Sequence, residues 1–300
     1  MPPASSIPCY GSSPLERLCA GILLSSALVL SHGASARAQS SSGPNPQPIF
    51  DSSTLPDAPS PQSTNPAPNG SDRKANVSLR TTPTNLLKDQ AAIWTSPARI
   101  REHNVALLVP LVLATTLTMS VDHQVMSSAR LDDASLNSHA ETASNGLVGG
   151  FIAAPVIIYG LGHIHHDDHA TETGILAGEA IVDSLVVDEA LKAVSMRERP
   201  TVDGAKGKFF QSGVGLGSSF PSNHSIIAWS SATVIASEYN GPLTQLTAYG
   251  LAAGASLTRV LARQHFPSDV LVGSAVGWLI GRYVYHKHSK DADTLGLNGR

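Results

Sequence analysis

Hydrophobic positions follow a helical spacing over most of the chain after about residue 80. Apolar residues at intervals of three and four predict helices over about 85–94, 147–161, 172–194, 222–236, 243–263 and 268–286. Ser96 followed by Pro97 is typical of an N-cap with proline at the first helical position, which predicts another helix reaching about Val121. No run alternates in the manner of a strand. The pattern therefore predicts an all-α fold.

The beginning of the chain has a different pattern. An apolar run over residues 18–30 follows Arg17 and is followed by Ala-Arg-Ala at 36–38, a small-x-small cleavage sequence. The run is too short to span a bilayer comfortably, so residues 1–38 are predicted to be a secretory signal peptide, with an uncleaved anchor as the alternative. Both cysteines, Cys9 and Cys19, lie in this segment. A mature chain without thiols fits export to an oxidising compartment such as the periplasm or cell envelope.

Composition divides the rest of the chain into three parts. Residues 39–80 are rich in Ser, Pro, Asn and Gln and poor in branched aliphatic side chains. Such a segment cannot bury enough apolar surface to offset the entropy of ordering, so it is predicted to be a disordered tether. Residues 81–286 carry the helical pattern and are predicted to form one folded domain, and residues 287–300 are predicted to be a polar tail.

Two of the predicted helices are apolar enough to raise the question of membrane insertion. Residues 105–121 and 142–162 are uncharged and near spanning length, although each contains a proline. The next predicted helix carries carboxylates, each of which would cost about 2.5–3.5 kcal/mol at the bilayer centre. These carboxylates are Glu172, Glu179, Asp183, Asp188 and Glu189. They favour an exported domain that contacts a membrane over one that spans it.

The charge balance restricts the partners of this protein. The chain has 20 Lys and Arg against 23 Asp and Glu, which argues against a nucleic-acid partner and requires any bound anion to be held locally. Lys192 and Arg199 are candidates for such local binding, because Pro200 ends the helix and both cations can project from that end toward a shared point. Taken alone, the two cations are equally well explained as complements of a helix dipole.

A second motif, Pro-Ser-Asn-His at residues 221–224, opens a predicted helix. Unpaired backbone N–H groups at a helix start suit a phosphate, as does the Ser222 hydroxyl. A glycine-rich approach over residues 213–217 lets the backbone come close to a ligand. The alternative for Ser222 is a simple N-cap, although His224 is a further group suited to phosphate chemistry.

The third motif combines Arg259, His265 and Asp269. Arg259 lies in the last turns of one predicted helix, and His265 and Asp269 flank the start of the next. A carboxylate four residues after an imidazole can accept its ring N–H, fix the tautomer and make the other nitrogen a better nucleophile. Such a pair alone is more often a structural cap. The three motifs in this order favour phosphate-ester chemistry.

The combination Lys-x6-Arg-Pro, Pro-Ser-x-His and Arg-x5-His-x3-Asp resembles the signature of the type 2 phosphatidic acid phosphatase and vanadium haloperoxidase superfamily. The resemblance covers residues 192–269 and, with the surrounding helical pattern, about 93–286. It implies a bundle of about six helices. It also implies that catalysis in a phosphatase member uses no metal and no other cofactor.

The resemblance further implies a role for each motif residue. His265 would attack phosphorus to form a phosphohistidine, Asp269 would orient His265, and His224 would protonate the leaving alcohol and then assist the attacking water. The groups implied to hold the non-bridging oxygens are Lys192, Arg199, Ser222, Asn223 and Arg259. Because the two imidazoles need opposite protonation states, a bell-shaped pH profile is expected.

Some residues near the motifs need separate interpretation. Asn223 stands where the family often has glycine, and Thr258 where it often has serine; asparagine tolerates tight backbone conformations and threonine keeps a hydroxyl. Arg263 could be a fourth phosphate ligand or pair with a carboxylate, and the pairing is favoured.

Residues 163–169 contain four histidines and two aspartates, and their spacing favours a solvated turn over a metal site.

The sequence thus predicts a metal-independent phosphatase of phosphate esters. Export and apolar helices favour a lipid phosphate, such as phosphatidate or an isoprenyl diphosphate. A broad-specificity periplasmic acid phosphatase is an alternative within the same chemistry. Another is a vanadium-dependent haloperoxidase, with vanadate as its cofactor and His265 as its ligand. A non-catalytic envelope protein that retains the fold is the third.

Overall fold

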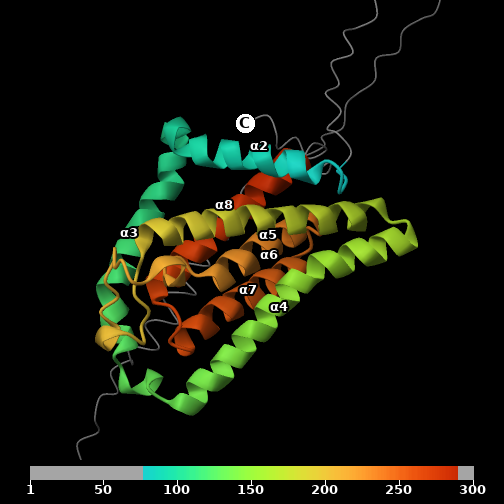
Figure 1. The fold of residues 1–300 in the computed structure, drawn as a ribbon. Coiled ribbons are helices and arrows are strands. Elements are labelled where there is room, and N and C mark those ends of the chain that lie inside the picture. Colours follow the sequence, from blue (N-terminus) through green and yellow to red (C-terminus); the bar gives the residue numbers. More distant parts are fainter. Residues whose placement is uncertain (1–76, 290–300) are drawn as a thin grey trace, which may run out of the picture.

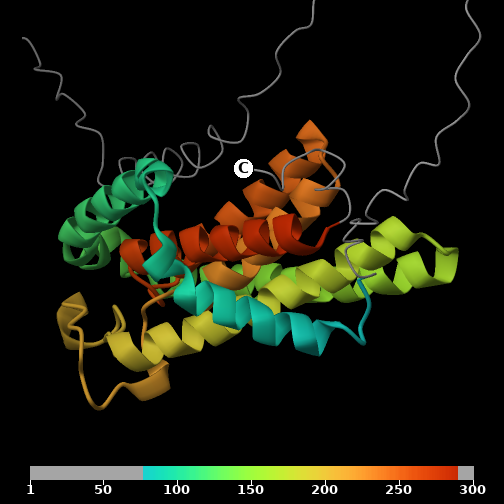
Figure 2. The ribbon, with the colours of Figure 1, turned by 90° about the horizontal axis from the view of Figure 1, so that it is seen from above.

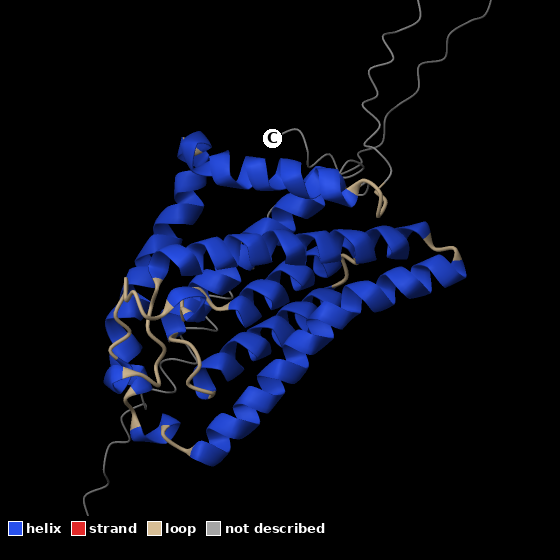
Figure 3. Cartoon of the chain, in the orientation of Figure 1, coloured by secondary structure: helices blue, strands red, loops and turns tan. Residues whose placement is uncertain are grey.

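The computed structural model describes residues 77–289, apart from the side chains of residues 102–104, and this part is built from helices and loops (Figure 1). The α-helices are α2 (Thr82–Thr95), α3 (Glu102–Met126), α4 (Ala134–His165), α5 (Asp168–Ser195), α6 (Asn223–Glu238), α7 (Pro242–Leu261) and α8 (Pro267–His288). Short 3-10 turns are η1 (Ser96–Arg99), η2 (Ala129–Leu131), η3 (Asp203–Ala205) and η4 (Gly215–Gly217). Residues 77–289 contain no strand (Figure 3), which confirms the all-α prediction. The seven helices are close to the number that the resemblance implied.

Helix α6 lies at the centre of the bundle. It packs against α4, α5, α7 and α8, and nearly all of its side chains from Ser225 to Val234 are buried (Figure 1). Ile226, Trp229 and Ala232 form the middle of the core between α4 and α7. A second cluster joins the end of α3 to the start of α8, and a third joins α5, α6 and α8. Helix α6 is thus surrounded on most sides, although α3 and α4 are more apolar in composition.

Very close packing brings α6 and α8 together. A β-carbon at Gly273 would lie 2.7 Å from the Ser222 carbonyl oxygen, and one at Gly277 would lie too close to the Ile226 carbonyl oxygen. Gly281 meets Ser230 in the same way, one turn further along. These glycines recur every four residues and so occupy one face of α8. Side chains at these positions would force α8 away from α6.

The polar residues over 163–169 form the turn between α4 and α5. His166 adopts a left-handed conformation at the end of α4, and the Asp167 carboxylate caps α5 by accepting a hydrogen bond of 3.0 Å from the Ala170 backbone N–H. His169 contacts Glu238 at 3.3 Å. The turn is largely exposed, in agreement with a solvated connection between two antiparallel helices.

Two helix starts differ from the sequence-based prediction. Ser96 does not cap a long helix: its hydroxyl donates backward to the Ile93 carbonyl at 2.7 Å, and the chain passes through η1 and an extended Ile100 before α3 begins. Helix α4 begins well before residue 147, because Asp133 caps it through the N–H groups of Ser135 and Leu136. The first turns of α4 are polar and exposed, so apolar spacing could not reveal them.

The carboxylates of α5 point mostly into the bundle. Glu172, Glu179, Asp183 and Asp188 are buried, and Glu189 is exposed. A carboxylate opposes membrane insertion when it faces hydrocarbon, but these four side chains face the protein interior. Their presence therefore does not exclude a helix that lies in a membrane. Two helices of the described part are long and apolar enough to cross a membrane: residues Val105–Met126 of α3 and all of α4. Length and composition alone are weak evidence for spanning.

The predicted signal peptide, most of the tether and most of the polar tail lie outside the described residues. Residues 77–80, the end of the predicted tether, lie within the described part. Helix α8 continues to His288, slightly past the predicted domain end at residue 286.

Candidate active site

The three motifs come together at one end of the bundle. Lys192 lies in the last turn of α5, Arg199 in the loop that follows it, His224 in the first turn of α6, Arg259 in the last turn of α7, and His265 just before α8. In Figure 1 the long loop after α5 lies on the left, at the end of the bundle where α5 finishes. All three cations are close enough to His224 to lower its pKa. The site therefore combines four helix ends that are distant in sequence.

His265 is fully buried and makes one hydrogen bond. Its Nδ1 lies 2.6 Å from the Ser219 carbonyl oxygen, and its Nε2 has no hydrogen-bond partner among the described residues. Burial, and then the positive charges of Arg199 and Arg259, hold the pKa of His265 well below its ordinary value. The ring is thus neutral, with Nδ1–H donated to Ser219 and the Nε2 lone pair unpaired. A neutral imidazole in this state is suited to act as a nucleophile.

Asp269 does not accept the ring N–H of His265, so this part of the sequence-based prediction was wrong. Asp269 Oδ2 is 3.9 Å from His265 Nδ1, which is too long for a hydrogen bond. The carboxylate instead accepts from the Ser219 hydroxyl at 2.7 Å and from the Phe266 backbone N–H at 2.8 Å. Its position in the first turn of α8 directs it toward the N–H groups at its own helix start. Asp269 therefore acts on His265 indirectly, by fixing Ser219.

Arg197, which lies between Lys192 and Arg199 in the sequence, connects Asp269 with other buried polar groups. Arg197 donates to Asp269, to Ser268 Oγ at 2.8 Å and to Asp122 Oδ2 at 2.8 Å. Its guanidinium also lies over the Phe266 ring, 4.1 Å from the centroid. The Arg197 backbone carbonyl accepts from the Ser219 N–H at 2.9 Å. Arg197 thus holds both Ser219 and the carboxylate that binds Ser219.

His224 has a different environment. Its Nδ1 lies 2.9 Å from Asn223 Oδ1 and its Nε2 lies 3.0 Å from Asn145 Oδ1. Burial, then the charges of Arg259, Lys192 and Arg199, lower the pKa of His224 to about 4. The two amide oxygens can both accept from a protonated ring. An anion that neutralised the cations would therefore favour the imidazolium form.

The three predicted cations differ in how they are held. Lys192 Nζ pairs with Asp188 at 2.6 Å. Arg199 donates to the carbonyl oxygens of Gly217, at 3.2 Å, and Gln264, at 3.1 Å. Arg259 is buried, and its Nε has no partner among the described residues. Burial and the neighbouring Arg199 lower the pKa of Arg259 to about 10. Arg199 and Arg259 are thus neighbouring guanidinium groups, an arrangement suited to binding an anion.

Ser222 and Asn223 lie at the start of α6, as predicted, but their side chains have other contacts. The Ser222 hydroxyl is fully buried, caps no backbone N–H and accepts from Ser225 Oγ at 3.1 Å. Asn223 Oδ1 accepts from the His224 backbone N–H at 2.8 Å as well as facing its ring. The structure thus gives Asn223 a contact with His224, whereas a phosphate contact by either side chain stays a prediction.

Arg263 lies outside this cluster. Its guanidinium pairs with Asp132, which confirms the prediction that it binds a carboxylate. The motifs did not reveal Ser219, Arg197, Asp122 or Asn145. Arg197 had one signal, its position two residues before Arg199 on the loop, but Asp122 and Asn145 come from α3 and α4 and no spacing links them to the motifs.

An all-helical bundle with two imidazoles, a buried carboxylate and clustered cations defines a class of phosphate-binding enzymes. Comparison with known families agrees with this class: residues 173–293 match the model of the PAP2 superfamily, and this match includes every predicted site residue. Lipid A 1-phosphatase of Porphyromonas gingivalis is 36% identical over 69 residues, which are 22% of this chain and 16% of that protein. No solved structure gave a significant match.

These findings confirm the predicted resemblance to the type 2 phosphatidic acid phosphatase superfamily over residues 173–293. They also support the interpretation that this region is that of a phosphatase. The region shared with the lipid A 1-phosphatase is a small part of that protein.

Proposed function

We propose that this protein is a phosphatase that hydrolyses phosphate esters through a phosphohistidine on His265. The observation that carries the proposal is the state of that ring: it is buried and neutral, and its Nε2 is unpaired among the described residues while Arg199 and Arg259 are near enough to lower its pKa. A neutral nitrogen beside two guanidinium groups can attack a phosphorus atom whose oxygens those groups hold.

In the first step, His265 Nε2 forms a bond to phosphorus as the bond from phosphorus to the ester oxygen breaks. The leaving oxygen takes a proton from His224, which the bound phosphate holds in its protonated form. Arg199, Arg259 and Lys192 stabilise the charge on the non-bridging oxygens, which is the main task in phosphoryl transfer. Ser219 keeps the proton of His265 on Nδ1, because its carbonyl accepts that N–H.

In the second step, the neutral His224 takes a proton from a water molecule, which attacks phosphorus from the side opposite His265. The bond between Nε2 and phosphorus breaks, and inorganic phosphate leaves. The same imidazole thus serves first as acid and then as base. Both steps use groups of the protein and one water molecule, and neither step calls for a metal, as the resemblance implies.

We favour a lipid phosphate as the substrate. The protein from Porphyromonas gingivalis to which this chain is similar is a lipid A 1-phosphatase, which is a phosphatase of a lipid. Several large apolar side chains of α3 and α4 are exposed, which is typical of a surface that contacts a membrane or another protein. These side chains include Val112, Leu113, Leu117, Val156, Ile157 and Leu161. A membrane-associated protein of the cell envelope would meet such a substrate directly.

A comparison of substrates tests this function. The purified protein is assayed for hydrolysis of phosphatidate and of an aryl phosphate, with and without EDTA, and for bromide oxidation with vanadate and peroxide. The proposal predicts hydrolysis that EDTA does not abolish, with phosphatidate preferred over the aryl phosphate. Bromide oxidation without hydrolysis would instead identify a haloperoxidase, and hydrolysis of soluble esters alone would identify a broad-specificity phosphatase.

A further inference from the structure

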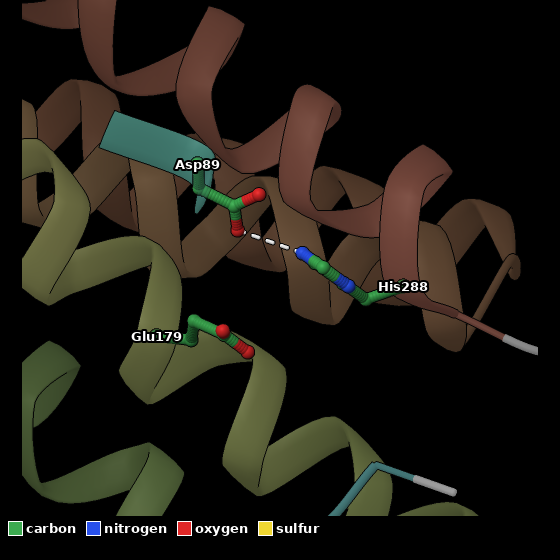
Figure 4. A group of neighbouring side chains, drawn as sticks. All are labelled: Asp89, Glu179 and His288. Atoms are coloured by element: carbon green, nitrogen blue, oxygen red, sulfur yellow. Dashed lines mark hydrogen bonds and ion pairs between the residues drawn. The ribbon is translucent and has the colours of Figure 1, made fainter. Parts of the chain in front are cut away.

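A second group of ionisable side chains lies away from the phosphate site, where α2, α5 and α8 meet. Asp89 of α2, Glu179 of α5 and His288 of α8 each offer a ligand atom, and these atoms lie within 4.8 Å of one another. Figure 4 shows Asp89 bonded to His288 and the Glu179 carboxylate facing this pair from α5. The three residues come from positions far apart in the chain, so the fold alone brings them together.

Asp89 and Glu179 are deeply buried, and His288 is partly buried. Asp89 is 0% exposed and Glu179 is 1% exposed. Asp183, one turn after Glu179 on α5, is also fully buried and adds a third carboxylate. Among the described residues, His288 is the one group that forms an ion pair with these carboxylates, at 2.7 Å from Asp89 Oδ2. Buried carboxylates are normally paired with a cation or bound to a metal, because removing their charge from water is costly.

Glu179 is the strongest evidence that the group serves a ligand. Neither of its carboxylate oxygens has a hydrogen bond of acceptable length and angle among the described residues, although the Asn85 side chain lies close enough to act as a weak hydrogen-bond donor to this carboxylate. Asp89, by contrast, accepts from Tyr283 at 3.0 Å and from His288, and Asp183 accepts from Gln90 at 2.8 Å. A buried carboxylate whose neighbours include a neutral amide, an aspartate and an imidazole is arranged like a metal ligand.

We propose that Asp89, Glu179 and His288 form a binding site for a divalent cation of the Zn²⁺ or Mn²⁺ type, which fastens α2 to α5 and α8. One imidazole with carboxylates suits these ions better than Ca²⁺, which takes oxygen ligands, or Cu⁺, which prefers sulfur. Tyr283 hydrogen-bonds Asp89 and so would orient it as an outer-sphere group.

The proposed site borders a cavity through one of its three residues. His288 lines a cavity of about 250 Å³ beside the start of α2. Three basic residues, Arg80, Lys88 and Lys287, line the same cavity, but none of them pairs with Glu179 in the described part of the chain. The cavity therefore reaches His288, and in the described part of the chain the neighbouring basic residues form no ion pair with Glu179.

The cation would have a structural role separate from the phosphate chemistry. Helix α2 packs chiefly against α5 (Figure 2), so a metal that links it to two helices of the bundle would restrict its opening. Removal of the metal is therefore expected to loosen α2 without stopping phosphate hydrolysis.

Metal content and amide exchange test the proposal. The untagged full chain is equilibrated with Zn²⁺, Mn²⁺ or Mg²⁺, its bound metal is counted, and hydrogen exchange is followed in α2. We expect one Zn²⁺ or Mn²⁺ per chain, slower exchange over residues 82–95 when the metal is bound, and affinity weakened on the order of 100-fold in Glu179→Gln and in His288→Gln. His165→Gln, in the exposed histidine-rich turn, is the matched control and should bind like the wild type.

Several outcomes of the same experiment would contradict a metal site at Asp89, Glu179 and His288. Absence of stoichiometric metal in the wild-type chain would overturn the proposal whether or not the variants fold, and so would binding that survives in both Glu179→Gln and His288→Gln. Loss of binding in His165→Gln would assign the metal to the turn over residues 163–169 instead. A Glu179→Gln protein that is more stable than the wild type at every metal concentration would show that a proton, and not a metal, compensates Glu179.

Discussion

His224 and His265 are distinguished by what surrounds each ring. His265 is fully buried and donates Nδ1–H to the Ser219 carbonyl, and its Nε2 has no hydrogen-bond partner among the described residues. His224 faces two amide oxygens that can stabilise its protonated form. The surroundings of the two rings thus differ, and the roles of nucleophile and acid that we propose rest on this difference.

The acid role of His224 predicts a dependence on the leaving group. In His224→Ala, hydrolysis of an alkyl phosphate should fall by about 10²–10⁴-fold, because an alkoxide needs a proton to leave. Hydrolysis of 4-nitrophenyl phosphate should fall much less, since nitrophenolate leaves without one. Rates of both substrates measured in His224→Ala and in the exposed control His139→Gln check this. An equal loss on both substrates would contradict the role.

The pKa shifts predict an acidic optimum for kcat/KM. His265 stays neutral over the accessible range because its pKa is well below the ordinary value. The productive state needs one proton shared between His224, whose pKa is lowered to about 4, and a phosphate group with a pKa of about 6. kcat/KM should therefore fall below about pH 4 and above about pH 6. A profile of kcat/KM that is flat, or that rises into the alkaline range, would be inconsistent with this.

Asp122 is expected to act as a positioning residue through Arg197. Asp122→Asn removes a charge that holds Arg197, which in turn fixes Asp269 and Ser219. We expect kcat to fall by about 10–100-fold with little change in KM, because Asp122 is not expected to contact the substrate. Asp132→Asn, which breaks only the pair with Arg263, is the control. A variant with lower thermal stability but unchanged kcat would show that Asp122 is merely structural.

At the scale of helices, periodic apolar segments could be predicted from the sequence and polar helix starts could not. Helices α5 to α8 lie within a few residues of their predicted bounds, because their buried faces recur at helical spacing. The start of α4 depends on the Asp133 cap and on exposed polar turns. Ser96 has the sequence context of an N-cap, since a proline follows it, but its hydroxyl donates a hydrogen bond to the Ile93 carbonyl of the preceding helix.

The contact between α6 and α8 predicts a cost for one added methyl group. Gly277→Ala should destabilise the protein by about 1–3 kcal/mol, because the new β-carbon meets the Ile226 backbone. It should also lower kcat, since α6 carries His224 and α8 begins beside His265. Gly250→Ala on α7 has open space and should be neutral or stabilising. Thermal unfolding and kcat of both variants check this, and equal behaviour of the two would contradict the close packing.

At the scale of the whole molecule, the site joins segments that no local pattern connects. The motif residues lie together at one end of the bundle, and their residue types and order are those that phosphate chemistry would restrict. Asp122, Asn145 and Ser219 could not be predicted, since only the packing of α3, α4 and the loop before α6 brings them to the motifs. The cluster of Asp89, Glu179 and His288 was hidden for the same reason.

The central claim, a phosphohistidine on His265, is tested most directly by trapping the intermediate. The enzyme is mixed with a ³²P-labelled phosphate ester, quenched in alkali within one turnover, and digested for peptide mapping. We predict label on the peptide that contains His265, stable in alkali and lost in acid, and absent from His265→Ala, whose hydrolysis should fall by at least about 10⁴-fold. Label on another residue, or full hydrolysis by His265→Ala, would contradict the account.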